Sequence, residues 1–274
     1  LVETYLAQKV MPDRKHVIWV QDPFDENDYK LLGSVDPNYK INRLRFWTTV
    51  TPYRRAYKRA DLVLTHARYF IPKIERLYDI NPVKVIYLPN PVERIPQESE
   101  IKKPSEPLVC YLGRMDPQKR YWLFFKLARK FPNVEFVAVG RPCLLYEELY
   151  ERIVRKYREL DNLKIVGFVN EEMKSEILSK SWVICLPSIR EGLPIAFLEA
   201  LAHKSAILSY VNPDNFAGRF GYHAADENFE AGLKELLKGD LWRKKGEDGY
   251  KFINEVHEIG KVIDMLAHKI GELR

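Results

Sequence analysis

The chain has 274 residues, of which 46% are hydrophobic and 30% are charged, so it can bury a sizeable core and is not of the disordered class. No apolar run approaches the roughly 18 to 20 residues that a membrane-spanning helix needs. The formal net charge of +6 favours an anionic small ligand or an anionic membrane surface. Nucleic acid is not an expected partner, because the basic residues are dispersed and no nucleic-acid-binding motif is present.

Apolar runs typical of strands alternate with amphipathic stretches typical of helices along the whole chain. The expected strands are residues 16–21, 62–65, 84–88, 108–112, 134–139, 163–168, 182–186 and 205–210. The expected helices are residues 42–60, 68–77, 119–130, 144–160, 171–180, 229–238 and a terminal helix over 254–274. Repeated β-α units of this kind predict an α/β fold with parallel sheets covered on both faces.

A polar stretch over residues 95–107 that carries three prolines is typical of a linker between domains. We therefore expect a first domain with its linker over 1–104, a second doubly wound domain over 105–254, and a terminal helix over 255–274 that returns to the first domain. Only three expected strands precede the linker, about half of a usual six-stranded domain. The chain also begins with Leu1 rather than methionine, so the first domain is expected to be incomplete.

The segment from Trp182 to His203 carries the strongest functional signal. A buried strand is followed by a turn at Glu191 and Gly192 and by a helix that opens at Pro194. Glu199 lies on a nearly apolar face of that helix, where a carboxylate is costly unless something pairs with it. A tight glycine turn before a helix N-terminus also suits an anion.

A second constellation follows the strand over 108–112, at the edge of the sheet where doubly wound folds bind ligands. Asp116 and Pro117 are good N-cap and N1 residues, so Lys119 and Arg120 are expected in the first turn of the next helix. Because the helix dipole disfavours cations there, this placement indicates a bound anion. A solvated helix start is the alternative interpretation.

Together these motifs resemble the retaining GT-B glycosyltransferases of family four. The resemblance rests on Gly113-Arg114 with Lys119, on Glu191-Gly192-Leu193-Pro194 with Glu199, and on Leu88-Pro89-Asn90 ahead of the linker. It covers the chain from about Val17 to the terminal helix. It implies a fold of two Rossmann-like domains facing across a cleft. The implied reaction moves a hexosyl group, with retention, from a UDP- or GDP-sugar to a sugar or lipid-linked acceptor.

The resemblance also implies roles for single residues. Arg114 and Lys119 would hold the diphosphate and stabilise the charge that grows as it leaves. Glu199 would accept hydrogen bonds from the ribose hydroxyls, and Glu191 would contact the transferred sugar. The backbone of Gly113 would lie at the donor.

Three further positions are implied through their backbone atoms. The amides of Gly192 and Leu193 would approach the sugar and the phosphate, and the backbone of Val169 would meet the base. Gln21 departs from the pattern, because a histidine commonly ends that strand in the family. Its presence keeps open the alternative of a nucleotide-sugar-binding protein without activity. A glycoside hydrolase that uses Glu191 and Glu199 is the other alternative.

Residues suited to metals or redox chemistry are sparse. No Asp-x-Asp pair and no cluster of histidine and cysteine is present, so we expect neither a metal nor a cofactor. Cys110, Cys143 and Cys185 lack CxxC spacing and are expected to be reduced and buried, as in a cytoplasmic protein. A run of basic and aromatic residues between Arg43 and Arg59, including Arg45, could contact an anionic membrane or a lipid-linked acceptor, although a solvated helix face is the commoner origin of such a run.

Overall fold

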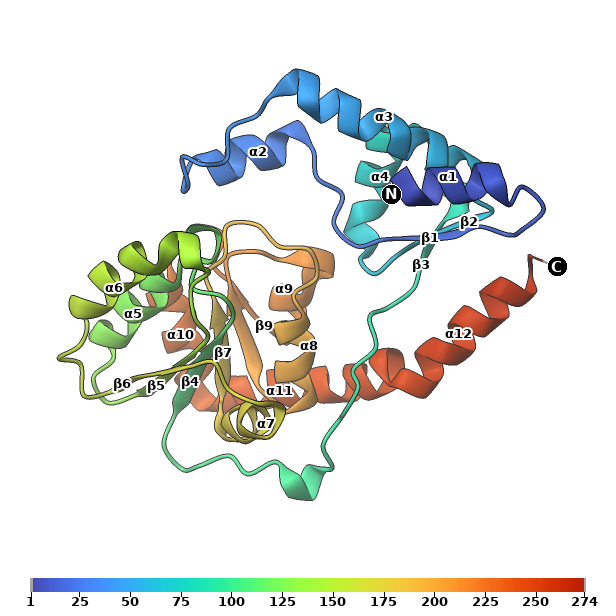
Figure 1. Ribbon diagram of the computed structural model, residues 1–274. Coiled ribbons are helices and arrows are strands. Elements are labelled where there is room, and N and C mark those ends of the chain that lie inside the picture. Colours follow the sequence, from blue (N-terminus) through green and yellow to red (C-terminus); the bar gives the residue numbers. More distant parts are fainter. Residues whose placement is uncertain (1, 274) are drawn as a thin grey trace. The chain divides into compact units, whose positions relative to one another are not determined.

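The computed structural model describes residues 2–273, and the side chains of residues 2–5, Arg45 and Pro82 lie outside what it describes. The chain divides into two compact units (Figure 1). Residues 1–91 and 259–274 form the smaller unit, and residues 92–258 form the larger unit.

The smaller unit is built on a parallel three-stranded sheet of order β1-β2-β3. Its strands are β1 (Val17–Val20), β2 (Leu62–Thr65) and β3 (Val85–Tyr87), and its helices are α1 (Val2–Val10), α2 (Glu26–Gly33), α3 (Arg43–Arg59), α4 (Ile71–Tyr78) and α12 (Ile259–Gly271). Leu64 on β2, Leu88 and Val262 on α12 form one apolar cluster, against which Leu266 also packs. The terminal helix is thus part of the core of this unit.

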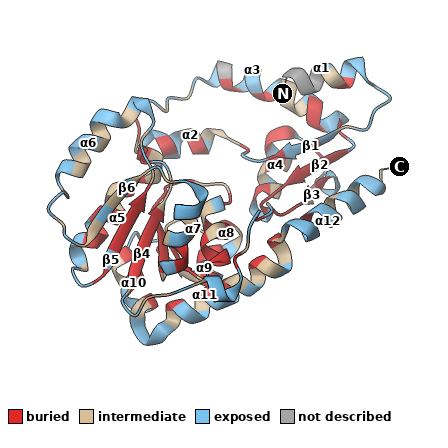
Figure 2. Cartoon of the chain, turned by 60° about the horizontal axis from the view of Figure 1, so that its bottom comes forward, coloured by how far each residue is buried: buried red, intermediate tan, exposed pale blue. Residues whose placement is uncertain are grey.

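The larger unit is a parallel six-stranded sheet of order β6-β5-β4-β7-β8-β9, whose strands are mostly buried (Figure 2). Its strands are β4 (Leu108–Leu112), β5 (Glu135–Val139), β6 (Leu163–Gly167), β7 (Val183–Leu186), β8 (Ala206–Ser209) and β9 (Gly221–His223). The helices are α5 (Tyr121–Lys130), α6 (Glu147–Arg155), α7 (Glu171–Lys180), α8 (Ile195–Ala202), α9 (Phe216–Phe220), α10 (Phe229–Leu237) and α11 (Leu241–Phe252). This is the doubly wound order in which the strand sequence reverses once.

The reversal lies beside β4. From β4 the chain proceeds to β5 and β6 on one side of the sheet, and it then returns to β7 on the other side. The loops that leave β4 and β7 at their carboxyl ends therefore diverge, and ligands of open α/β sheets bind in the crevice between such loops. The expected α/β fold with two parallel sheets is confirmed, and β9, a strand of three residues, is an element that the sequence pattern did not predict.

Three expected helices differ in extent. The helix expected from Lys119 begins at Tyr121, because Pro117–Lys119 form a 3-10 turn and Arg120 takes a left-handed conformation with φ of 47°. Only Glu147–Arg155 of the long helix expected over 144–160 is α-helical. The terminal helix is interrupted at Glu258, which is extended and pairs with Val92 in a parallel bridge.

The basic and aromatic run forms α3, and its residues serve packing within the smaller unit. Phe46 is buried, and the guanidinium of Arg54 lies 5.2 Å from the ring centroid of Trp47 and donates to the backbone oxygen of Leu77 at 2.8 Å. Lys58 forms an ion pair with Asp79. None of the helices over residues 2–273 has the length and apolar character that crossing a membrane requires.

Two glycines hold the carboxyl ends of β4 and β5 close together. Gly140, with φ of 137°, packs so tightly that a Cβ atom built on it would lie 1.8 Å from the backbone oxygen of Gly113. The amide of Gly113 in turn donates to the oxygen of Val139 at 3.1 Å. Only a residue without a side chain fits position 140, so this edge of the sheet depends on glycine there.

We expect Gly140→Ala to destabilise the larger unit by about 3 kcal/mol or more, because its methyl group must displace backbone. Gly271→Ala is the matched control, since no heavy atom lies within 4 Å of a Cβ at that position. Its effect should stay within about 0.5 kcal/mol. Urea unfolding followed by circular dichroism measures both, and equal midpoints for the two variants would contradict the close approach.

Helices α7 and α8 are joined by the buried side chain of His203. Its Nδ1–H donates to the backbone oxygen of Glu199 at 2.7 Å, which leaves Nε2 to accept from the hydroxyl of Ser175 at 2.8 Å. Burial lowers the pKa of His203 to about 4. The folded unit therefore holds a neutral imidazole at the end of α8.

A stability change with pH follows from this shift. Between pH 6.5 and 4 the unfolded chain binds a proton at His203 that the folded chain does not bind, so stability falls as the pH drops through this window. The expected loss is about 3 kcal/mol. Comparing urea unfolding of the wild type and His203→Gln at pH 7 and pH 4.5 isolates the contribution, because the other titrating groups are common to both. A variant with the same pH dependence as the wild type would refute the neutral-imidazole assignment.

Candidate functional site at the carboxyl edge of the larger sheet

A cavity of about 950 Å³ opens where β4, β5 and β6 end. Gly113 and Arg114 line it directly after β4, and Val139 lines it at the end of β5. Helices α7 and α8 contribute Lys174 and Glu199. The other residues of the lining are Leu112, Gly140–Leu145, Glu147, Phe168, Val169 and Glu171. The volume lies within the range of small-molecule and cofactor sites.

An ion-pair cluster lies at one part of this cavity. The Lys174 ammonium contacts the Glu199 carboxylate at 2.6 Å and the Glu171 carboxylate at 2.7 Å. Burial works against the charged form of Lys174, but the hydrogen bonds that it donates to these two carboxylates raise its pKa above the ordinary value. The partner that a carboxylate on this apolar face requires is therefore supplied within the protein. The apolar helical neighbours of Glu199 are as predicted, and a helix distant in sequence supplies the cation.

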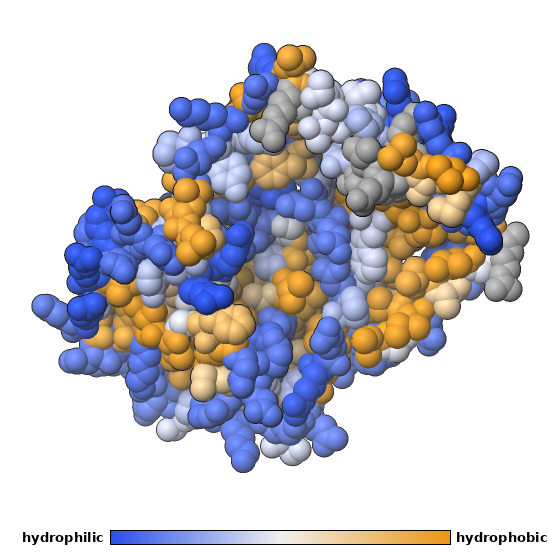
Figure 3. Space-filling view, in the orientation of Figure 1, coloured by the Kyte–Doolittle hydropathy of each residue, from blue (hydrophilic) through white to orange (hydrophobic). Residues whose placement is uncertain are grey.

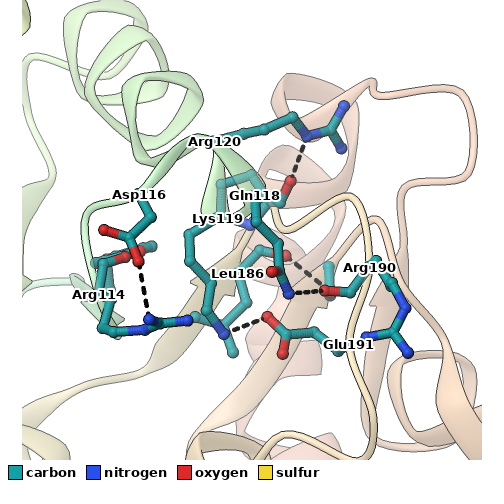
Figure 4. Close-up of polar contacts among 11 residues, drawn as sticks. Arg114, Asp116, Gln118, Lys119, Arg120, Leu186, Arg190 and Glu191 are labelled. Carbon is teal, nitrogen blue, oxygen red and sulfur yellow. Dashed lines mark hydrogen bonds and ion pairs between the residues drawn. The ribbon is translucent and has the colours of Figure 1, made fainter. Parts of the chain in front are cut away.

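A second pair lies at the reversal of the sheet. The Lys119 ammonium contacts the Glu191 carboxylate at 2.5 Å, with 18% and 9% of the two side chains exposed. The Arg114 guanidinium lies 3.2 Å from the buried Asp116 carboxylate and is itself 63% exposed. In Figure 4 the side chains of Arg114 and Lys119 extend toward one another, with Glu191 at the end of Lys119. Two cations, each with its own carboxylate partner, thus lie in the loops that follow β4 and β7.

Backbone contacts hold these two loops together. The amide of Ile189 donates to the oxygen of Gln118 at 3.0 Å, and the side-chain amide of Gln118 donates to the oxygen of Arg190 at 2.9 Å (Figure 4). Lys119 follows Gln118 in the chain, and Glu191 follows Arg190. The bonds between Gln118 and the second loop therefore hold Lys119 close to Glu191.

Arg120 has a structural role that the sequence did not indicate. Its Nε donates to the backbone oxygen of Pro187 at 2.7 Å, its Nη1 pairs with Glu227, and its guanidinium lies 4.5 Å from the ring centroid of Tyr210. The side chain is buried, so Arg120 is no anion ligand in a helix's first turn. Lys119 and Arg120 were predicted to hold an anion together, but only Lys119 extends toward Glu191 and Arg114.

The predicted site residues fall into two groups. Gly113, Arg114, Val169 and Glu199 line the cavity, although Gly113 and Glu199 are 86 positions apart in the chain. The other four, Lys119, Glu191, Gly192 and Leu193, lie outside the lining, in the loops that follow β4 and β7. Lys119 and Glu191 are joined directly by their ion pair.

Several lining residues were not predicted. Phe168 is 75% exposed and has the guanidinium of Arg141 at 5.4 Å from its ring centroid. Cys143 is exposed and lines the cavity, so the expectation that all three cysteines are buried was wrong for this one. An aromatic residue at the carboxyl end of a predicted strand is the signal that could have identified Phe168. Nothing in the local sequence marks Lys174, because its partner Glu199 is remote.

Apolar atoms are exposed near the cavity and elsewhere. Leu144 and Leu145 are 85% and 69% exposed and belong to the lining. Figure 3 shows apolar residues gathered on this face around α6 and along α12. Those near α6 give the cavity an apolar rim beside its charged groups, which is the usual composition of a small-molecule site.

Comparison with known proteins shows which protein family and which solved structures the chain resembles. The family model described as glycosyl transferases group 1 matches residues 93–245. Sucrose-phosphate synthase from Thermosynechococcus elongatus is similar in structure, with a TM-score of 0.71 at 16% identity over 98% of this chain and 71% of that chain. HepE of Anabaena in complex with UDP has a TM-score of 0.79 at 11% identity, over 99% of this chain and 76% of that chain.

The pneumococcal O-GlcNAc transferase GtfA, in complex with UDP and GlcNAc, has a TM-score of 0.72 at 15% identity, over 98% of this chain and 54% of that chain. None of the curated proteins compared with the chain matches it. At these identities the structural likeness establishes the fold, which is GT-B, with a small first unit. Since the family model covers more than half of the residues, the chain belongs to the group 1 glycosyltransferases.

Proposed function

We propose that the chain transfers a hexosyl group, with retention at the anomeric carbon, from a nucleotide-sugar to a sugar or lipid-linked acceptor. The observation that carries the proposal is the cavity at the ends of β4, β5 and β6, with Arg114 and Glu199 in its lining. It lies within the larger unit, and its volume of about 950 Å³ suits a nucleoside diphosphate joined to a sugar.

The nucleoside would occupy the part of the cavity that holds Glu199. There the carboxylate would accept hydrogen bonds from the ribose hydroxyls while Lys174 holds it in place from 2.6 Å. The backbone of Val169 would meet the base. The exposed ring of Phe168 next to it offers a flat apolar surface for stacking.

The diphosphate would lie near Arg114 and Lys119. Two cations there would stabilise the negative charge that develops as the nucleotide leaves, and the amides of Gly192 and Leu193 would add backbone donors. Glu191 would contact the transferred sugar and also keeps Lys119 positioned through their ion pair at 2.5 Å. In this proposal the charge is neutralised by side chains and amides, and no divalent metal is required.

The relatives favour uridine as the base. HepE of Anabaena is described in complex with UDP and with UDP-glucose, and GtfA in complex with UDP and GlcNAc. We therefore propose a UDP-sugar ahead of a GDP-sugar as the donor. A contact of α3 with an anionic membrane remains part of the proposal for a lipid-linked acceptor, with the exposed Trp47 as its apolar group.

Glycoside hydrolysis by Glu191 and Glu199 is disfavoured by their surroundings. A hydrolase of this type needs one carboxyl group to donate a proton to the leaving oxygen. Here each carboxylate contacts a lysine ammonium, Lys119 or Lys174, at 2.6 Å or less. Both carboxylates are therefore engaged by lysine side chains of the protein, and neither is free of a cation as a proton donor would be.

Replacing Glu199 with glutamine should weaken UDP binding by about 1.5 to 3 kcal/mol, because a charge-assisted hydrogen bond to the ribose is lost. Isothermal titration calorimetry of the folded variant measures this. Glu176→Gln on α7 is the control, since its carboxylate pairs with Lys180 on the surface and is 64% exposed. Wild-type affinity in Glu199→Gln would refute the ribose assignment.

Replacing Lys119 with methionine should lower kcat of transfer about 10²- to 10³-fold, as expected on losing one group that stabilises charge developing in the transition state. Lys126→Met, at an exposed position on α5, is the control and should leave kcat unchanged. UDP release in the presence of excess acceptor provides the assay. Loss of wild-type activity on adding EDTA would contradict the metal-free mechanism, and UDP binding without any turnover would favour the inactive binding protein.

A further inference from the structure

Arg120 has a backbone conformation that is unfavourable for a residue with a long side chain. It follows the 3-10 turn Pro117–Lys119 and takes the left-handed conformation, with φ of 47° and ψ of 36°. Glycine adopts this conformation without steric cost, whereas a residue with a Cβ atom needs compensating interactions. The guanidinium is also buried, and its Nη2 has no hydrogen-bond partner among the residues that the structure describes. Residues that depart from local rules in this way are typical of functional sites.

The side chain of Arg120 connects the loop after β4 with the segments that follow three other strands. Its hydrogen bond to Pro187 reaches the loop after β7, over residues 187–194. Its guanidinium packs on Tyr210, directly after β8, and pairs with Glu227, four residues beyond β9. Only 6% of the side chain is exposed, so these contacts are shielded from water.

Lys119 lies between the two residues that hold the loop after β7. On one side of it, the backbone oxygen of Gln118 accepts from the amide of Ile189 at 3.0 Å. On the other side, Arg120 donates to the backbone oxygen of Pro187 at 2.7 Å. In Figure 4 the side chain of Arg120 points away from that of Lys119. The loop is therefore attached on both sides of the lysine, and Arg120 supplies one of the two attachments.

We propose that Arg120 is a positioning residue for the transfer reaction and acts through the loop over residues 187–194. By holding Pro187, it keeps Glu191 and Lys119 in place relative to one another, with 2.5 Å between carboxylate and ammonium. This role rests on the proposed function, in which Lys119 stabilises the charge that develops on the leaving diphosphate. Such stabilisation depends on where the cation lies in the transition state, so loss of Arg120 lowers kcat while the nucleotide still binds.

Arg129 provides a matched comparison within the same unit. It also donates to a backbone oxygen, that of Lys156 at 2.8 Å, and its guanidinium lies 4.6 Å from the ring centroid of Tyr157. It is in the last turn of α5, and neither Arg129 nor these partners line the cavity. Arg129 thus repeats two of the contacts of Arg120 at a place that has no part in the proposed site.

Arg120→Met and Arg129→Met in the full chain test the role. Transfer is followed as UDP release from UDP-glucose, UDP-galactose and UDP-N-acetylglucosamine, with methyl glycosides as acceptors. Calorimetric titration with UDP counts the binding sites, so that kcat is expressed per folded site. Arg120→Met should lower this kcat about tenfold or more and change KM for the donor and the Kd of UDP less than about threefold. Arg129→Met should leave all three constants unchanged.

Hydrogen exchange at the amide of Ile189 tests the hold on the loop without any activity. Exchange should become about tenfold faster or more in Arg120→Met, because one attachment of the loop is lost, and it should stay unchanged in Arg129→Met. Arg120→Lys is the second variant and decides the question if Arg120→Met does not fold. Lysine keeps a cation beside Glu227 but has no Nε–H for Pro187, so both the loss in kcat and the faster exchange should persist.

Unchanged exchange at Ile189 in both Arg120 variants would overturn the proposal. A merely structural role would reduce the number of UDP-binding sites and leave kcat per site as in the wild type, and that result would overturn it too. So would a rise in KM with kcat unchanged. A wild type that binds UDP but releases none from these donors would refute the proposed transfer, and exchange at Ile189 alone would then decide whether Arg120 holds the loop.

Discussion

The ion pair between Lys119 and Glu191 joins two loops that leave neighbouring strands in different directions. β4 and β7 lie side by side in the sheet, but the chain proceeds from β4 to one side and from β7 to the other. Contacts between the two loops therefore determine how far apart they lie. These contacts are the ion pair at 2.5 Å and the hydrogen bonds of Gln118 with Ile189 and Arg190.

The cations of the proposed donor site are paired with carboxylates of the protein. Lys119 is paired with Glu191, Lys174 with Glu199 and Glu171, and Arg114 with Asp116. Each cation has a carboxylate partner before any ligand is present, which lowers the cost of holding charges in partly buried positions. In the proposed donor site, a diphosphate would therefore replace the carboxylate partners of these cations. Arg114, with 63% of its side chain exposed, is the most readily available for such an exchange.

The two units use different chemistry for their cavities. The cavity of the larger unit combines an apolar rim with ion pairs, which suits a ligand that is part base and part diphosphate. A cavity of the smaller unit, lined by Phe24, Tyr29, Phe46, Tyr53 and Tyr78, has one charge of each sign and rings that meet edge to face. The difference follows from composition. Aromatic residues are concentrated between Phe24 and Tyr78, whereas glycines and charged residues follow the strands of the larger unit.

The sequence by itself determined the elements with strong periodic patterns. Runs of five and four residues predicted β4 and β2 with their observed bounds, and the helix over 171–180 was predicted residue for residue. It also proposed Arg114, Lys119, Glu191 and Glu199 as site residues, from a glycine turn, a carboxylate on an apolar helix face and the family resemblance. β9, with three residues, is too short for its alternation to be recognised.

Only the tertiary structure decided how the charges are paired. Lys119 and Arg120 are adjacent in sequence and chemically alike, yet one contacts Glu191 and the other is buried against Pro187 and Glu227. The left-handed backbone at Arg120 directs the two side chains apart. Lys174 reaches Glu199 across 25 residues of chain, which no local pattern indicates. Periodicity is a property of neighbouring residues, whereas an ion pair depends on which helices the sheet brings together.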